Sequence, residues 1–124
     1  MGLIRKRLLV AGERAERECQ VLFDTGASAC FVCKDVAEEL GRPVKALRPP
    51  TFALGDGTQI TAQHTTVLQV NMDGHWIIHM FLVVPQLPVE VIIGADFLQR
   101  WKIGLDPVTE EFIIDEKALE ILLV

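Results

Sequence analysis

The sequence lacks an excess of basic residues, a long hydrophobic run and a complete set of cysteine pairs. Its 124 residues hold 12 Lys and Arg against 17 Asp and Glu, a net charge of -5, which argues against nucleic acid or an anionic membrane as the main partner. No hydrophobic stretch reaches the roughly 18 residues of a membrane-spanning helix, and no signal peptide is visible. The three cysteines are an odd number, which is typical of free thiols in a reducing compartment, so we expect a cytoplasmic protein.

Several common catalytic and cofactor signatures are also missing. The chain shows no Ser-His-Asp arrangement and no glycine-rich phosphate loop. Cys30 and Cys33 have the spacing of a zinc or redox pair, but no second cysteine pair exists, and His64, His75 and His79 lack ligand spacing relative to it. We interpret His75 and His79 as polar residues on the exposed face of a strand, and we expect no metal or other cofactor.

Hydrophobic periodicity predicts a single, mainly β domain over residues 1–124, with two short helices. The expected strands are 7–10, 18–23, 65–72, 75–84, 89–94, 102–106 and 111–115, with a hairpin over 51–62 and helices over 34–40 and 95–101. Alternation along the second strand places Leu22 and Asp24 on one face and Val21 and Phe23 on the other.

The tripeptide Asp24-Thr25-Gly26 follows this apolar strand directly. A carboxylate at the end of a strand is held by the backbone, and Gly26 lets the chain turn sharply and leaves room for a substrate backbone. The Thr25 hydroxyl can lock the turn by hydrogen bonding. The same three residues are also ordinary turn chemistry, so the tripeptide alone indicates either a catalytic carboxylate or a plain turn.

Together with later segments, this turn resembles the active site of retroviral-type aspartic proteases (retropepsins). "LFDTGAS" (22–28) is followed by a glycine-tipped hairpin and then by "VIIGADFL" (91–98), and "FVCKDVAEELG" (31–41) is similar to the retrotransposon and cellular branch of the family. The resemblance implies a retropepsin-like acid protease fold, which is a closed β-barrel-like half-site with short helices that forms a homodimer. It also implies aspartic endopeptidase activity on polypeptides.

The same likeness assigns roles to individual residues. Asp24 would be the catalytic aspartate, Thr25 and Gly26 would complete its turn, and the hairpin over 51–65 would be the flap that covers the substrate. The substrate-binding residues that it implies are Leu22, Ala27, Ser28, Gly55, Asp56, Gly57, Val89 and Ile92.

One Asp-Thr-Gly provides one carboxylate, whereas the reaction of this family uses two. The resemblance therefore implies an isologous homodimer in which Asp24 meets its own copy. As in aspartic proteases generally, two adjacent carboxylates share a proton. The ionised carboxylate activates water and the protonated one donates to the peptide carbonyl, so no metal is needed. The alternative on the same fold is a dimeric peptide-binding module that does not cleave.

Two positions depart from the pattern of many family members, in which an acidic residue after the Asp-Thr-Gly-Ala pairs with an arginine after the Ile-Gly. Here these positions are Ser28 and Ala95, so other contacts must hold the dimer. Asp96 could be an intramolecular partner for Asp24, but its place in the first turn of the expected helix favours a helix-stabilising role.

The apolar C-terminal run 119–124 is predicted to be an edge strand, with Leu119, Ile121 and Leu123 on one face. Such a strand invites aggregation unless another strand pairs with it. We therefore expect a second subunit to cover it, with the N-terminal segment 3–10 contributing to the interface.

Overall fold

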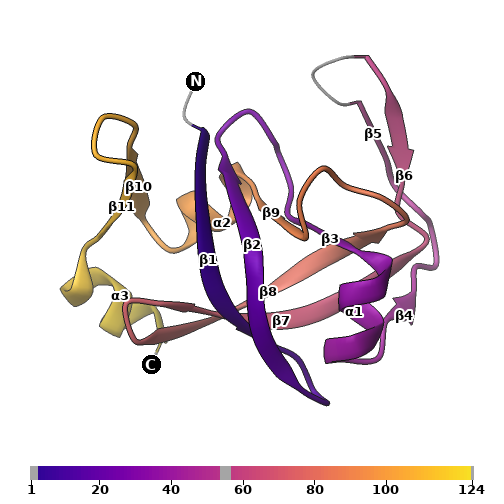
Figure 1. Cartoon of the computed structure of the whole chain (residues 1–124), viewed down its shortest axis with the longest axis horizontal. Coiled ribbons are helices and arrows are strands. Elements are labelled where there is room, and N and C mark those ends of the chain that lie inside the picture. Colours follow the sequence, from indigo (N-terminus) through magenta and orange to yellow (C-terminus); the bar gives the residue numbers. More distant parts are fainter. Residues whose placement is uncertain (1–2, 54–56, 124) are drawn as a thin grey trace.

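The computed structural model describes residues 3–53 and 57–123, and it shows a closed β barrel with short helices packed outside it (Figure 1). The helices are α1 (Lys34–Leu40), α2 (Ala95–Arg100) and α3 (Glu116–Leu123). The strands are β1 (Leu3–Ala11), β2 (Glu16–Asp24), β3 (Phe31–Cys33), β4 (Val44–Lys45), β5 (Thr51–Ala53), β6 (Gln59–Thr61), β7 (His64–Met72), β8 (His75–Val84), β9 (Val91–Ile93), β10 (Ile103–Asp106) and β11 (Glu111–Ile114). No helix within these described ranges has the length and hydrophobicity needed to cross a membrane.

The barrel is a ring of strands in the order β1-β2-β9-β3-β8-β7, which closes where the end of β1 pairs with β7. Two of the pairings are parallel, β2 with β9 and β3 with β8. Strand β9 therefore lies between β2 and β3, although these two follow each other along the chain. The short β4 extends the sheet beyond β7, while β5-β6 and β10-β11 form separate hairpins. The expected mainly β, barrel-like fold is thus confirmed.

Strand β2 has two buried faces that serve different clusters. Val21 and Phe23 belong to the main hydrophobic core, whereas Leu22 belongs to a second, smaller cluster together with Ile92 and Leu82. The predicted alternation is therefore correct, and it separates residues that stabilise the barrel from residues that lie on the same face as Asp24.

The turn between β1 and β2 packs against the end of α1. The carbonyl oxygen of Leu40 accepts hydrogen bonds from the amides of Arg14 (2.8 Å) and Ala15 (3.2 Å). A Cβ atom on Gly12 would lie 2.3 Å from that same oxygen, so this position requires glycine. These contacts satisfy a helix-terminal carbonyl that has no partner within the helix.

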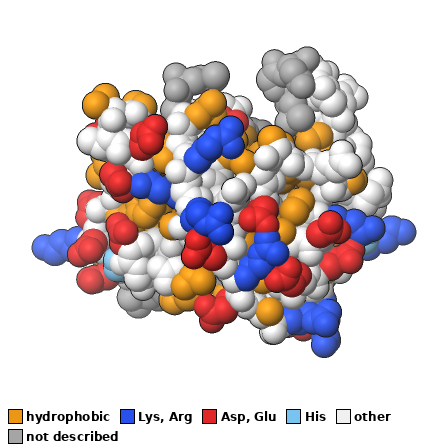
Figure 2. Space-filling view, viewed as in Figure 1, with side chains coloured by type: hydrophobic (Ala, Val, Ile, Leu, Met, Phe, Trp, Pro, Cys, Tyr) orange, Lys and Arg blue, Asp and Glu red, His pale blue; other side chains and the backbone are white. Residues whose placement is uncertain are grey.

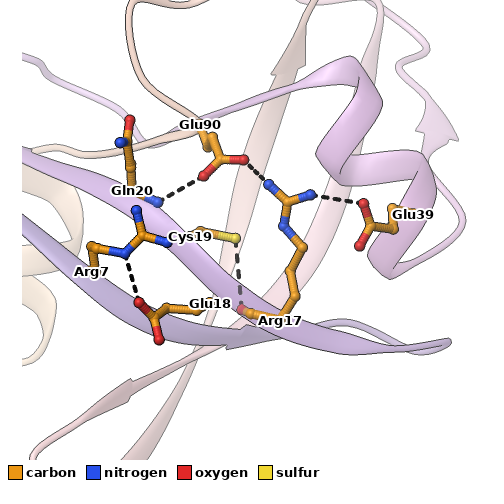
Figure 3. A network of polar contacts seen from close by, with 7 residues as sticks. All are labelled: Arg7, Arg17, Glu18, Cys19, Gln20, Glu39 and Glu90. Atoms are coloured by element: carbon orange, nitrogen blue, oxygen red, sulfur yellow. Dashed lines mark hydrogen bonds and ion pairs between the residues drawn. The ribbon is translucent and has the colours of Figure 1, made fainter.

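A charged network connects β2 to α1 and to the segment before β9 (Figure 3). Arg17 forms an ion pair with Glu39 at 2.8 Å and another with Glu90, and Glu90 also accepts the amide hydrogen of Gln20 at 2.9 Å. Charges of both signs are interspersed across the lower half of the visible face (Figure 2). Since such partly exposed pairs contribute about 0.2–1 kcal/mol each, the network orients these segments more than it stabilises them.

The C-terminal prediction was wrong, because residues 116–123 form the helix α3 and not an edge strand. The carboxylate of Asp115 accepts the amide of Ala118 at 3.1 Å, which is the hydrogen bond of a helix N-cap. Leu119 is fully buried while Ile121 is 75% exposed. The two side chains therefore lie on different faces, as helical geometry requires and strand alternation would not allow.

The predicted orientation of β8 was also wrong. His75 and His79 lie in the same row as the buried Ile77, whereas the exposed side chains of this strand are Trp76, Ile78 and Met80. Both rows of β8 are largely apolar, so alternation alone did not reveal which one faces the core. The short strands β3 and β4 were not anticipated.

Candidate active site

Asp24 is the last residue of β2, and its turn is closed by two short-range hydrogen bonds. The carboxylate oxygen Oδ1 accepts the amide hydrogen of Gly26 at 2.8 Å, and the main-chain oxygen of Asp24 accepts the amide hydrogen of Ala27 at 3.1 Å. The Asp24 side chain is half-buried, whereas Thr25 and Gly26 are exposed. The carboxylate is therefore held in a defined orientation at a surface that a second molecule can reach.

The loop that follows Asp24 is clamped by the start of α2. The amide of Ala95 donates to the carbonyl oxygen of Ala27 at 2.7 Å. A Cβ atom on Gly94 would lie 2.7 Å from that oxygen and 2.2 Å from the carbonyl oxygen of Ala29. Only glycine permits this approach, which explains why a glycine follows the buried strand β9.

The predicted pocket residues come together in one hydrophobic cluster. Leu22, Val89 and Ile92 are all nearly buried there, and Ala27 packs against them. Leu22 lies two residues before Asp24 on the same face of β2, so this cluster adjoins the carboxylate. Ser28, by contrast, is exposed on the loop.

The hairpin β5-β6 contributes residues that the sequence interpretation missed. Phe52 and Ile60 pair across the hairpin and pack against the same cluster, and the Phe52 ring meets that of Phe31 edge-on at 5.4 Å. The alternation of polar and apolar residues in this segment was the available signal. The second cluster, which we call the hairpin cluster, therefore joins apolar residues of β2, β9 and the hairpin.

The same hairpin corresponds to most of the predicted flap. In Figure 1 it projects from the barrel on the side where the loop after β2 lies. Its base is closed by a hydrogen bond between the hydroxyls of Thr51 and Thr61 at 2.9 Å. Gly57 has a positive φ of 88° and open space around it, which suits a hairpin tip. Gly55 and Asp56 lie outside the described residues.

A cleft of about 520 Å³ opens on another side of the turn, next to Thr25. Leu98 and Ala95 of the α2 region line it together with Leu105 and Pro107 from β10 and the turn after it. The cleft thus combines one residue of the Asp-Thr-Gly turn with apolar side chains from the C-terminal third of the chain.

At the end of the loop, the carboxylate of Asp96 contacts Cys30 and His79. Its Oδ1 accepts hydrogen bonds from the Cys30 thiol at 3.1 Å and from the Phe97 amide at 2.8 Å, and its Oδ2 lies 3.0 Å from His79 Nε2. Burial raises the pKa of the Cys30 thiol far above its ordinary value, against the opposing effect of the Gly94 amide. Cys30 is therefore a neutral hydrogen-bond donor, and Asp96 is bound by these groups.

Comparisons with known proteins decide which family this arrangement represents. The family described as "gag-polyprotein putative aspartyl protease" matches residues 10–100. The chain belongs to this aspartyl protease family. No curated protein matches the sequence.

Solved structures of similar shape support the retropepsin-like fold of this family member. The retroviral protease-like domain of Ddi1 from Leishmania major superposes with a TM-score of 0.68 and 22% identity, over 93% of this chain and 90% of that one. The EIAV protease, solved with the inhibitor HBY-793, gives a TM-score of 0.57 and 24% identity, over 77% of this chain and 86% of that one. At these identities the likeness shows the fold.

Proposed function

We propose that this retropepsin-like protein is a homodimeric aspartic endopeptidase with one Asp24 from each subunit in its active site. The observation that carries the proposal is the placement of Asp24. Its carboxylate is oriented by the Gly26 amide and adjoins the hairpin cluster, which includes residues of a projecting hairpin. A strand-held, accessible carboxylate next to such a hairpin is suited to acting on the backbone of an extended chain.

The second carboxylate comes from a second copy of the chain. The sequence contains one Asp-Thr-Gly, and the carboxylate of Asp96 is bound to Cys30 and His79. The cleft beside Thr25 and Ala95 offers an apolar surface next to the turn. A two-fold partner docked there would bring its own Asp24 turn to the axis, since an isologous interface pairs each residue near the axis with its copy.

The two Asp24 carboxylates together hold one proton in the resting dimer. The ionised carboxylate takes a proton from a water molecule, whose oxygen attacks the peptide carbonyl carbon, while the protonated carboxylate donates its proton to the carbonyl oxygen. Collapse of the resulting tetrahedral diol breaks the C–N bond: the leaving nitrogen takes the proton from the protonated carboxylate, and one diol hydroxyl gives its proton to the ionised carboxylate. The products are a carboxylic acid and an amine, and the carboxylates return to their starting state.

The hairpin cluster indicates the substrate class. Leu22, Val89 and Ile92 of the barrel and Phe52 and Ile60 of the hairpin are apolar and pack together, so a polypeptide that binds at the edge of this hairpin cluster would place hydrophobic side chains against it. We therefore expect cleavage next to hydrophobic residues.

The decisive experiment is to incubate the purified protein with a diverse peptide pool at several pH values and to sequence the products. Asp24→Asn removes both catalytic carboxylates of the dimer at once and should lower the cleavage rate by at least about a thousandfold. The matched control is Asp73→Asn in the turn between β7 and β8. Asp73 has a positive φ of 53° that asparagine also tolerates, so this variant should cleave like the wild type.

The dimer is tested by dilution. Specific activity should fall as subunits dissociate, and sedimentation should show the loss of dimer over the same concentration range. A fully active monomer, or an Asp24→Asn variant that cleaves like the wild type, would contradict the proposal. Peptide binding by the wild type without any cleavage would instead identify a non-catalytic binding module.

A further inference from the structure

We propose that Cys30, His79 and Asp96 form a binding site for a divalent ion of the zinc class, with water as the fourth ligand. The site lies at the end of the loop that follows Asp24, and the aspartic protease reaction does not require a metal ion there. Its three residues come from three parts of the fold, namely the segment before β3, strand β8 and helix α2.

The positions of the donor atoms carry the proposal. Cys30 Sγ, His79 Nε2 and an Asp96 carboxylate oxygen all lie within 4.8 Å of one another. Asp96 Oδ1 is 3.1 Å from Sγ, and Asp96 Oδ2 is 3.0 Å from Nε2. Given usual zinc–ligand bond lengths, ligand atoms around a tetrahedral ion are roughly 3.3–3.6 Å apart. Because these two separations go to different Asp96 oxygens, bringing one oxygen, Sγ and Nε2 around an ion requires shifts of up to about 1.2 Å from the 4.8 Å limit, which side-chain rotation can supply.

The side chain of His79 points toward the interior of the protein, which is unusual for a polar residue with only a structural role. It lies in the inward row of β8 between Ile77 and Phe81, both fully buried, where an aliphatic side chain would pack without polar atoms. Its ring is held edge-on by the rings of Phe81 and Phe97, at centroid distances of 6.1 and 5.1 Å. The packing orients Nε2 toward the other two donors before any ion binds, which lowers the cost of binding.

Main-chain amides support the other two ligands. The Gly94 amide donates to Cys30 Sγ at 3.4 Å, and the Phe97 amide donates to Asp96 Oδ1 at 2.8 Å. Such hydrogen bonds are the outer contacts that orient thiolate and carboxylate ligands around metal ions. Binding would form an Sγ–metal bond and release the thiol proton to solvent water.

The donor set and its exposure select the kind of ion. One sulfur, one imidazole nitrogen and one carboxylate oxygen favour Zn²⁺ and similar ions over Mg²⁺ or Ca²⁺, which prefer oxygen ligands. Cys30 is 1% exposed, whereas the side chains of His79 and Asp96 are 16% and 39% exposed. An ion and its water ligand can thus approach from the Asp96 side while the thiolate stays shielded.

A bound ion would cross-link the loop that follows Asp24 to helix α2, whose first residue already holds this loop. Cys30 ends this loop, and its carbonyl oxygen accepts the Leu82 amide at 2.9 Å. Asp96 directly follows Ala95, whose amide holds the front of the same loop. Metal binding should therefore raise the midpoint of thermal unfolding by several degrees, because it stabilises only the folded state.

The test uses the reduced chain of 124 residues after treatment with a chelator. Zn²⁺ is titrated in competition with a chromophoric chelator, and Co²⁺ is added separately while the absorption spectrum is recorded. We expect one ion per chain, a sulfur-to-cobalt charge-transfer band, the intense visible bands of a tetrahedral site, and the rise in unfolding midpoint. Cys30→Ser should abolish the charge-transfer band, and both Cys30→Ser and His79→Gln should weaken Zn²⁺ binding at least tenfold.

Matched controls are Cys33→Ser and His75→Gln, which change the same residue types outside the cluster and should bind Zn²⁺ like the wild type. The proposal is overturned if the wild type binds no stoichiometric ion, if its Co²⁺ spectrum lacks the sulfur band, or if Cys30→Ser binds Zn²⁺ as tightly as the wild type. A requirement for Cys33 would also overturn it, since it would indicate a Cys30–Cys33 pair instead. None of these readouts depends on peptide cleavage.

Discussion

Asp24 precedes the loop 25–30 and Asp96 contacts its last residue, Cys30, yet the two carboxylates have very different surroundings. The Asp24 carboxylate is bound by the amide of its own turn. The Asp96 carboxylate is bound by a thiol, an imidazole and an amide that come from three segments. A carboxylate that is oriented by its own turn alone suits chemistry on another molecule, whereas a carboxylate with both oxygens bound by side chains or amides of the fold suits structure or an ion. Environment, more than residue type, separates the two roles.

Gly94 affects both carboxylates, so its substitution should have the largest effect. In Gly94→Ala the new Cβ would lie 2.2 Å from the Ala29 oxygen, and main-chain atoms cannot move away cheaply. We expect the free energy of unfolding to fall by about 3 kcal/mol, as measured by urea denaturation. Gly104→Ala is the control, since its Cβ would meet Ile113 at 3.7 Å, an ordinary contact. Equal effects of the two substitutions would disprove the clamp.

Replacing Asp24 and Asp96 in turn with asparagine should separate the two roles directly. Asp96→Asn replaces an acceptor of several hydrogen bonds and should lower the free energy of unfolding by about 1–3 kcal/mol. Asp24→Asn keeps an oxygen that can accept the Gly26 amide and should change it by less than about 1 kcal/mol. Both are measured by urea unfolding with a chelator present, so that no metal ion contributes. If Asp24→Asn proved to be the more destabilising change, the assignment of roles would be reversed.

The third comparison has the smallest expected effect on stability, but it distinguishes the proposed flap hairpin from an ordinary hairpin by its effect on turnover. Gly57 and Gly74 both have positive φ angles, 88° and 87°, with open space where a Cβ would be. Valine at either position should therefore cost a similar strain of about 1–2 kcal/mol. Only Gly57→Val changes the hairpin that we propose to act as the flap, so it alone should reduce peptide turnover per folded molecule. If turnover were unaffected by Gly57→Val, residues 51–65 would not act as a flap.

Local patterns in the sequence predicted the features that depend on neighbouring residues. The turn at Asp24, the buried strand that ends at Gly94 and the glycine-tipped hairpin all depend on residue types within a few positions of each other. The two faces of β2 were also predicted, because one strand with strict alternation allows only one arrangement.

Features that depend on distant segments were not predicted. Cys30 and Asp96 are 66 positions apart and meet only because β3, β8 and β9 pack together, so spacing along the chain could not reveal their cluster with His79. The helix α3 was missed because an apolar run fits either period when it is short. The Asp115 cap, which identifies it as a helix, was present in the sequence but was not recognised.

The insertion of β9 between β2 and β3 has a consequence for how this protein is made. Leu22 pairs with Ile92, and the intervening residues must all leave the ribosome before that pairing can form. Contacts between such distant segments slow folding. The clamp on the loop after Asp24 therefore forms late, so a nascent or prematurely terminated chain that lacks β9 and α2 carries the aspartate without the framework that orients it.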